Sequence, residues 1–139
     1  MKRILVIAMM AAALHVSCAP TTERVLDADD ETQLQKRSYE SRIFDTSDKE
    51  KVLRATISTL QDLGFVIDRA DLTLGTVSGT KYAGFLMKIT VSARPKGNDR
   101  ILVRANAQFN ITPVDDPKQY QDFFSSLEKS LFLTAHEAD

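Results

Sequence analysis

The order of apolar and polar residues predicts one α+β domain over residues 38–139. Between residues 47 and 64, apolar side chains recur every three or four positions, which is the period of an amphipathic helix. Residues 85–94 and 100–111 instead alternate apolar and polar positions, as do strands of a sheet with one dry face. Residues 96–99 between them are turn formers, so we expect these two strands to pair as an antiparallel hairpin.

Weaker strand patterns complete the predicted sheet. A first strand is predicted at the start of the domain, with apolar positions at Tyr39, Ile43 and Phe44. Residues 65–68 and 76–82 form two further strands, with Gly75 in the turn between them. We therefore expect an antiparallel sheet of four to five strands.

Local signals mark the ends of two helices. Ser47 and Glu50 have the spacing of a capping box, so the first helix is expected to begin at Ser47. Gly64 favours the left-handed conformation that ends a helix. An acidic pair followed by Pro117, with Gln119 two positions later, predicts the start of a long C-terminal helix.

The C-terminal helix carries one apolar stripe, which is expected to cover the dry face of the sheet together with the shorter helix. The stripe consists of Tyr120, Phe123, Phe124, Leu127, Leu131 and Ala135. The residues expected to be buried together are Leu60, Ile89, Val103, Phe124 and Leu127. Phe132 and Leu133 lie off the stripe, so either the chain itself covers them or they bind a partner.

The first 17 residues read as a secretory signal peptide. Lys2 and Arg3 precede an apolar run from Ile4 to Val16. A run of about 13 residues is too short for a membrane span, which needs about 20. The segment is therefore expected to be cleaved.

The end of this segment, Val16-Ser17-Cys18-Ala19, resembles the lipobox of bacterial lipoproteins, apart from His15 where that pattern usually has Leu. The resemblance implies that lipid on Cys18 anchors the mature chain, and that Ala19 directs it to the outer membrane, facing the periplasm. Cys18 is the only cysteine and so has no disulfide partner within the chain. The alternative is a plain secretory signal with an incidental cysteine.

Residues 18–37 are polar and acidic, so we expect a flexible tether between the lipid and the domain. The formal net charge of the whole chain is −1, and loss of Lys2 and Arg3 makes the mature chain more acidic. Nucleic acid is therefore not an expected partner.

Few residues suggest catalysis. His136 is the only histidine beyond the signal segment, and a role at a helix C-terminus accounts for it. No catalytic residue, metal site or cofactor is predicted, because phosphate-binding and metal-binding motifs are missing from the sequence. Four cations on the polar face of the hairpin form a possible basic patch, or simply a solvated surface: Lys88, Arg94, Arg100 and Arg104.

Two resemblances lead to functional expectations. The segments Leu60-Gln61-Asp62-Leu63-Gly64-Phe65 and Tyr120-Gln121-Asp122-Phe123-Phe124 are similar to those of small Gram-negative envelope lipoproteins of mostly unknown activity. The element order is similar to that of the helix-grip domains of BamC-type lipoproteins. These resemblances imply a non-catalytic interaction or scaffold component of an envelope complex. The alternative is a module that binds an apolar or lipidic ligand between the C-terminal helix and the sheet.

Overall fold

The computed structural model describes residues 32–136, with side chains described as far as Phe132. The signal segment 1–17, Cys18, Ala19 and most of the expected tether lie outside the described residues. The described chain from Gln33 onward belongs to one compact unit. None of its helices combines the length and hydropathy that a membrane span requires.

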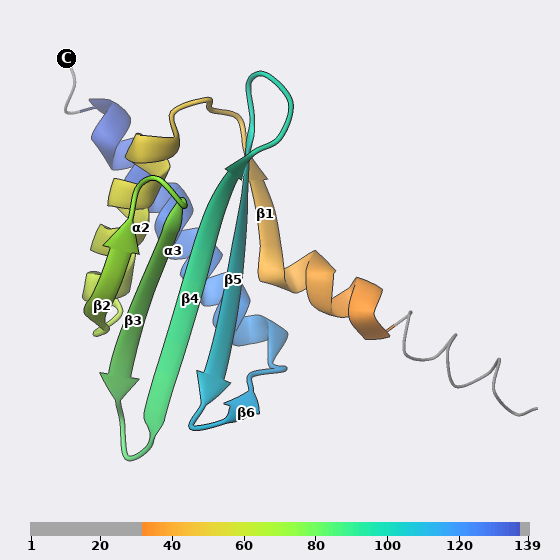
Figure 1. Ribbon diagram of the computed structural model, residues 1–139, viewed down its shortest axis with the longest axis vertical. Coiled ribbons are helices and arrows are strands. Elements are labelled where there is room, and N and C mark those ends of the chain that lie inside the picture. Colours follow the sequence, from red (N-terminus) through yellow and green to blue (C-terminus); the bar gives the residue numbers. More distant parts are fainter. Residues whose placement is uncertain (1–31, 137–139) are drawn as a thin grey trace, which may run out of the picture. The chain divides into compact units, whose positions relative to one another are not determined.

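Antiparallel strands form one sheet in the order β1-β5-β4-β3-β2 (Figure 1). Their bounds are Ser41–Phe44 for β1, Val66–Asp71 for β2, Thr76–Tyr82 for β3, Leu86–Pro95 for β4 and Ile101–Phe109 for β5. A two-residue strand, β6 (Thr112–Pro113), pairs with the end of β5. The predicted α+β class, the strand order along the chain and the central hairpin are confirmed.

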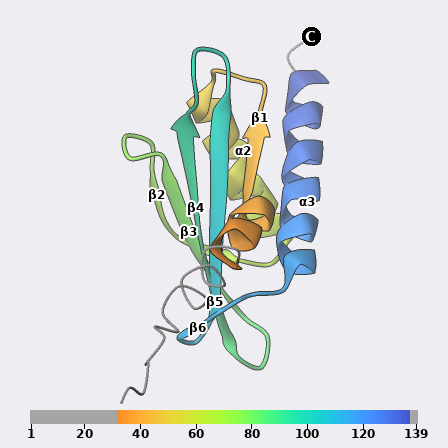
Figure 2. The ribbon, with the colours of Figure 1, turned by 90° about the vertical axis from the view of Figure 1, so that its right-hand side faces the viewer.

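Two helices, α2 (Lys49–Asp62) and α3 (Pro117–His136), lie on the same face of the sheet (Figure 2). Figure 1 shows α2 behind β2 and β3, with α3 running diagonally behind the sheet. In the part of the chain that is described, the opposite face carries no helix. The predicted helical cover of one sheet face is therefore confirmed.

The helix ends follow local backbone chemistry, with one correction. Asp48, not Ser47, caps α2, because its carboxylate accepts a hydrogen bond from the Lys51 N–H at 2.8 Å. At the other end Gly64 adopts a φ of +83°, and the N–H of Phe65 donates to the Leu60 carbonyl at 2.9 Å. This is a Schellman arrangement, and the left-handed Gly64 on which it depends is as predicted.

Alternation along the central hairpin separates a dry face from a polar one. In β4, Ile89 and Val91 are buried, while Lys88 and Thr90, which alternate with them, are exposed. The prediction that this pattern continues to Ile111 is wrong, since Ile111 is 91% exposed. The reason is local: β5 ends at Phe109, and Asn110 has a φ of +51°, which turns the chain away from the dry face.

One hydrophobic core lies between the sheet and the two helices. The residues predicted to be buried together all belong to it: Leu60, Ile89, Val103, Phe124 and Leu127. Their exposed fractions do not exceed 4%. Leu131, at the end of the apolar stripe, is partly buried, and the side chain of Ala135 lies outside the described residues.

The N-terminal boundary of the domain differs from the prediction. Residues 32–40 are helical, although the sequence placed residues 32–37 in a tether and Tyr39 in the first strand. The helix is held by contacts distant in sequence. Lys36 pairs with Asp115 at 2.8 Å, and the ring of Tyr39 lies 5.4 Å from that of Tyr120. Such contacts cannot be read from local polarity.

Candidate functional site

The four cations of the expected basic patch are exposed, but they do not form one cluster. Arg94 pairs with Leu102 across the hairpin, and Arg104 pairs with Ser92 two positions away. Arg100 precedes β5 at the same end of the hairpin. Lys88 lies opposite Gln108, about 20 Å further along β4 at the usual rise per residue. The structure thus brings three of the four cations to one end of the hairpin.

Arg104 already has a partner within the chain. Its guanidinium lies 3.1 Å from the Glu40 carboxylate, which belongs to the end of the N-terminal helix and is 8% exposed. An arginine that neutralises a buried carboxylate is less available to an external anion. The argument for a four-residue anion-binding patch is therefore weakened.

A hollow of about 250 Å³ opens beside the C-terminal half of α3. We call it the apolar hollow, and it is lined by Phe44, Asp45, Thr46, Lys51, Leu131 and Phe132. Phe132 is 64% exposed, so it is not a core residue of the described domain. The side chain of Leu133, its predicted partner in a docking surface, lies outside the described residues.

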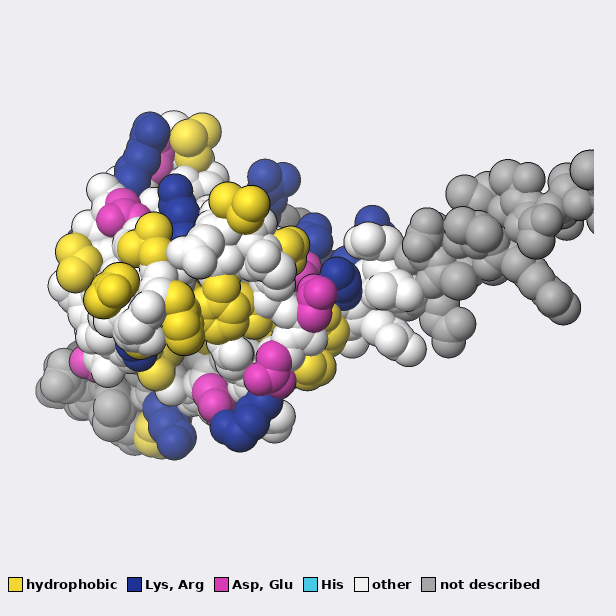
Figure 3. Space-filling view, turned by 90° about the horizontal axis from the view of Figure 1, so that it is seen from below, with side chains coloured by type: hydrophobic (Ala, Val, Ile, Leu, Met, Phe, Trp, Pro, Cys, Tyr) yellow, Lys and Arg dark blue, Asp and Glu magenta, His cyan; other side chains and the backbone are white. Residues whose placement is uncertain are grey.

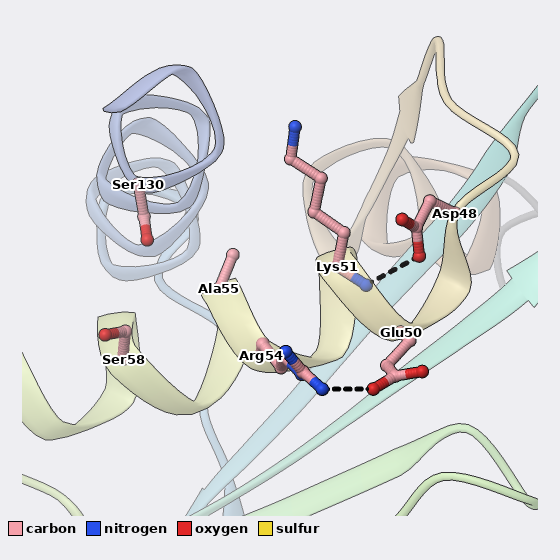
Figure 4. A pocket seen from close by; sticks show the side chains of 7 residues that line it. All are labelled: Asp48, Glu50, Lys51, Arg54, Ala55, Ser58 and Ser130. Carbon is pink, nitrogen blue, oxygen red and sulfur yellow. Dashed lines mark hydrogen bonds and ion pairs between the residues drawn. The ribbon is translucent and has the colours of Figure 1, made fainter. Parts of the chain in front are cut away.

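A larger and more polar hollow, of about 470 Å³, lies between α2 and α3 (Figure 4). We call it the helical hollow, and its lining is Asp48, Glu50, Lys51, Arg54, Ala55, Ser58 and Ser130. Ala55, Ser58 and Ser130 contribute short side chains where the two helices face each other (Figure 4). Lys51 lines both hollows, which are therefore neighbours.

The charges of the helical hollow are largely engaged within α2. Asp48 caps the helix, and Arg54 pairs with Glu50 one turn away (Figure 4). The lining contains neither histidine nor cysteine. Across residues 32–136, no three residues of the usual metal-binding types come together. The hollow therefore presents ion-paired and capping side chains together with the hydroxyl group of Ser58.

A small hollow of about 20 Å³ lies between α3 and the sheet, lined by Met87, Ile89, Ala107, Gln119, Tyr120 and Phe123. The Tyr120 hydroxyl donates to the Val114 carbonyl at 3.0 Å and accepts from the Ala107 N–H at 3.2 Å. Burial raises the pKa of Tyr120 above its usual value near 10. Its polar end is thus satisfied inside the domain.

Sequence reasoning identified Phe132 but missed the residues that make a hollow beside it. The helical period was sufficient to place Phe132 off the apolar stripe of α3. Phe44 and Lys51 reach the same place from β1 and α2, far away in the sequence. The outward position of Lys51 on α2 is a local signal, but its proximity to Phe132 depends on how the helices pack.

Neither a protein-family model nor a curated protein matches this sequence.

Proposed function

We propose that the chain is a lipid-anchored envelope protein that binds another protein without catalysing a reaction. Lipid on Cys18 holds it at the periplasmic leaflet of the outer membrane. The observation that carries the binding proposal is the pair of adjoining hollows that meet at Lys51. One is largely apolar and the other is charged.

The composition of these hollows suits a protein partner. Phe44, Leu131 and Phe132 supply apolar surface, and the neighbouring hollow supplies charged side chains and hydroxyl groups. Protein interfaces commonly have an apolar centre with a polar rim. Aromatic side chains at such a centre often contribute most of the binding energy.

The small volume of the hollow between α3 and the sheet favours a protein partner over a lipidic ligand at that place. A volume of about 20 Å³ has room for a single water molecule and not for an acyl chain. Tyr120, which borders this space, is held by two hydrogen bonds to the backbone. A ligand between α3 and the sheet would require this packing to open.

The proposed anchor leaves the domain room to reach its partner. About 14 residues separate Cys18 from residue 32, and a fully extended segment of that length spans about 45 Å. The helix formed by residues 32–40 is fixed to the domain through Lys36 and Glu40. The free length of the tether therefore ends at that helix.

Site-specific photo-crosslinking in intact cells tests the binding proposal. A photoreactive residue at position 132 should yield one dominant adduct with another envelope protein. The same residue at Ser125, which is exposed on α3 but does not line either hollow, is the matched control. Equal adducts at both positions, or none at position 132, would contradict the proposal.

A further inference from the structure

Four exposed apolar side chains gather at the end of the sheet where β3 turns into β4 and β5 turns into β6 (Figure 1). We call this set the apolar tip; it consists of Tyr82, Phe85, Leu86 and Ile111, with exposed fractions of 78%, 46%, 46% and 91%. Figure 3 looks onto this end of the molecule and shows hydrophobic side chains over the middle of the face, with charged ones mostly towards its margin. Exposed apolar residues gathered in this way mark a contact surface.

The two turns of the apolar tip are joined by specific contacts. Leu86 pairs with Tyr82 across the first turn, and its carbonyl accepts from the Asn110 N–H at 2.8 Å. The ring of Phe85 meets that of Phe109 edge to face, with 4.7 Å between ring centroids. The tip is therefore held in shape by the sheet below it.

The charges within the two turns have one sign. Residues 81–88 contain two lysines and no acidic residue, and residues 109–113 are uncharged. Lys88 is exposed, whereas the ammonium group of Lys81 donates to the Leu63 carbonyl at 2.8 Å. Acidic side chains lie only outside these turns, at the margin of the face in Figure 3. Apolar turns that carry an exposed lysine and no acidic residue of their own suit a phospholipid surface, whose head groups carry phosphate.

We propose that the apolar tip inserts into the interfacial layer of the phospholipid bilayer to which the chain is anchored. This inference rests on the proposed lipid anchor at Cys18. The proposed tether is long enough to let either end of the domain meet the membrane. The position of the apolar tip indicates which end does so. Tyrosine suits that depth because its ring is apolar and its hydroxyl group remains hydrated.

Membrane contact through the apolar tip would orient the apolar hollow. The turn between β3 and β4 lies at one end of the sheet, and the loop between β1 and α2 lies at the other (Figure 1). Asp45 and Thr46 of that loop line the apolar hollow. A domain that rests on its tip therefore presents this hollow away from the bilayer, towards a partner.

Single tryptophan reporters test the inference, because the natural chain contains no tryptophan. The full chain, carrying either Phe85→Trp or Ile111→Trp, is purified from the cells that produce it and reconstituted into vesicles of phosphatidylethanolamine and phosphatidylglycerol. Part of the lipid has brominated acyl chains, which quench tryptophan fluorescence on contact. Both reporters should be quenched and blue-shifted. Phe132→Trp, at the other end of the domain, should remain unquenched.

Flotation of the same vesicles separates failure of the anchor from failure of the tip. A chain that floats while both tip reporters stay unquenched would overturn the tip proposal and leave the anchor intact. A photoreactive residue at position 85 that captures a protein in cells, with no quenching in vesicles, would make the tip a protein-binding surface instead. A chain that does not float contradicts the anchor, and the tip proposal falls with it.

Discussion

Glu40 and Arg104 join the N-terminal helix to the central strand β5. Their carboxylate oxygen and guanidinium nitrogen lie 3.1 Å apart, with side-chain exposures of 8% for Glu40 and 49% for Arg104. A carboxylate taken this far out of water needs its partner, because an unpaired buried charge is costly. This pair therefore helps to hold the helix of residues 32–40 against the sheet.

Removal of the arginine should destabilise the domain. We expect Arg104→Met to lower the free energy of unfolding by about 1–3 kcal/mol, since it leaves the Glu40 carboxylate unpaired. The matched control, Arg94→Met, changes an exposed cation on the same sheet face and should cost less than about 0.5 kcal/mol. Glu40→Gln added to Arg104→Met should recover part of the loss. Equal urea melts for the two single variants would argue against a role for the pair.

The domain should lose stability in alkaline solution through Tyr120. Its pKa is raised by burial, so above pH 10 the unfolded chain releases this proton before the folded chain does. The free energy of unfolding then falls as pH rises. Tyr120→Phe should make that fall shallower, although burial also raises the pKa of Tyr39, which keeps part of the slope.

The Tyr120→Phe variant should also lose about 1–2 kcal/mol at neutral pH, because the Ala107 N–H and the Val114 carbonyl lose their side-chain partner. Tyr82→Phe, on the exposed apolar tip, is the control and should match the wild type throughout. Melts at a series of pH values from 7 to 11 measure both effects. An unchanged alkaline slope in Tyr120→Phe would refute the assignment.

Two buried threonines of α2 should respond in opposite ways to the same change. The Thr56 hydroxyl donates to the Val52 carbonyl at 2.8 Å, whereas the Thr59 hydroxyl has no hydrogen-bond partner among the described residues. Thr59→Val should therefore be neutral or stabilising by up to about 1 kcal/mol, and Thr56→Val should cost about 1 kcal/mol. Calorimetric melts that rank the two variants in the reverse order would contradict the hydrogen bonding described.

The apolar hollow can be separated from the core by substitution. Phe132→Ser combined with Leu133→Ser should barely change thermal stability. It should abolish capture of the partner by a photoreactive residue placed at Thr46, which lines the same hollow. Phe124→Ala and Leu127→Ala, in the core, should each cost about 2–5 kcal/mol. A loss of several kcal/mol in the double variant would instead place the pair in the core.

The sequence predicts this fold well wherever neighbouring residues decide the structure. The left-handed Gly64, the alternation along β4 and the apolar stripe of α3 each depend on contacts within a few positions or on a simple period. The N-terminal helix was not predictable in this way, because Tyr39 packs on Tyr120. The choice of Asp48 over Ser47 as the cap also depends on the exact path of the chain.

The candidate surfaces were only partly predictable. Phe132 lies off the apolar stripe of α3, so the helical period is enough to predict that its side chain is exposed. The apolar alternation of β5 predicts that Ile111 lies on the dry face, and only the backbone turn at Asn110 reveals that it joins the apolar tip. Both hollows depend on how α2, α3 and the loop after β1 pack together. That packing cannot be predicted from the pattern of neighbouring residues in one sequence.

The proposed function depends on lipid at Cys18, and fatty-acid labelling of growing cells detects that lipid. Wild-type chain should incorporate the labelled fatty acid and fractionate with the outer membrane. Cys18→Ser should incorporate none and leave a folded domain free of the membrane, because the described core is built from residues between Tyr39 and Leu131. A wild-type chain that takes up no label would contradict the account.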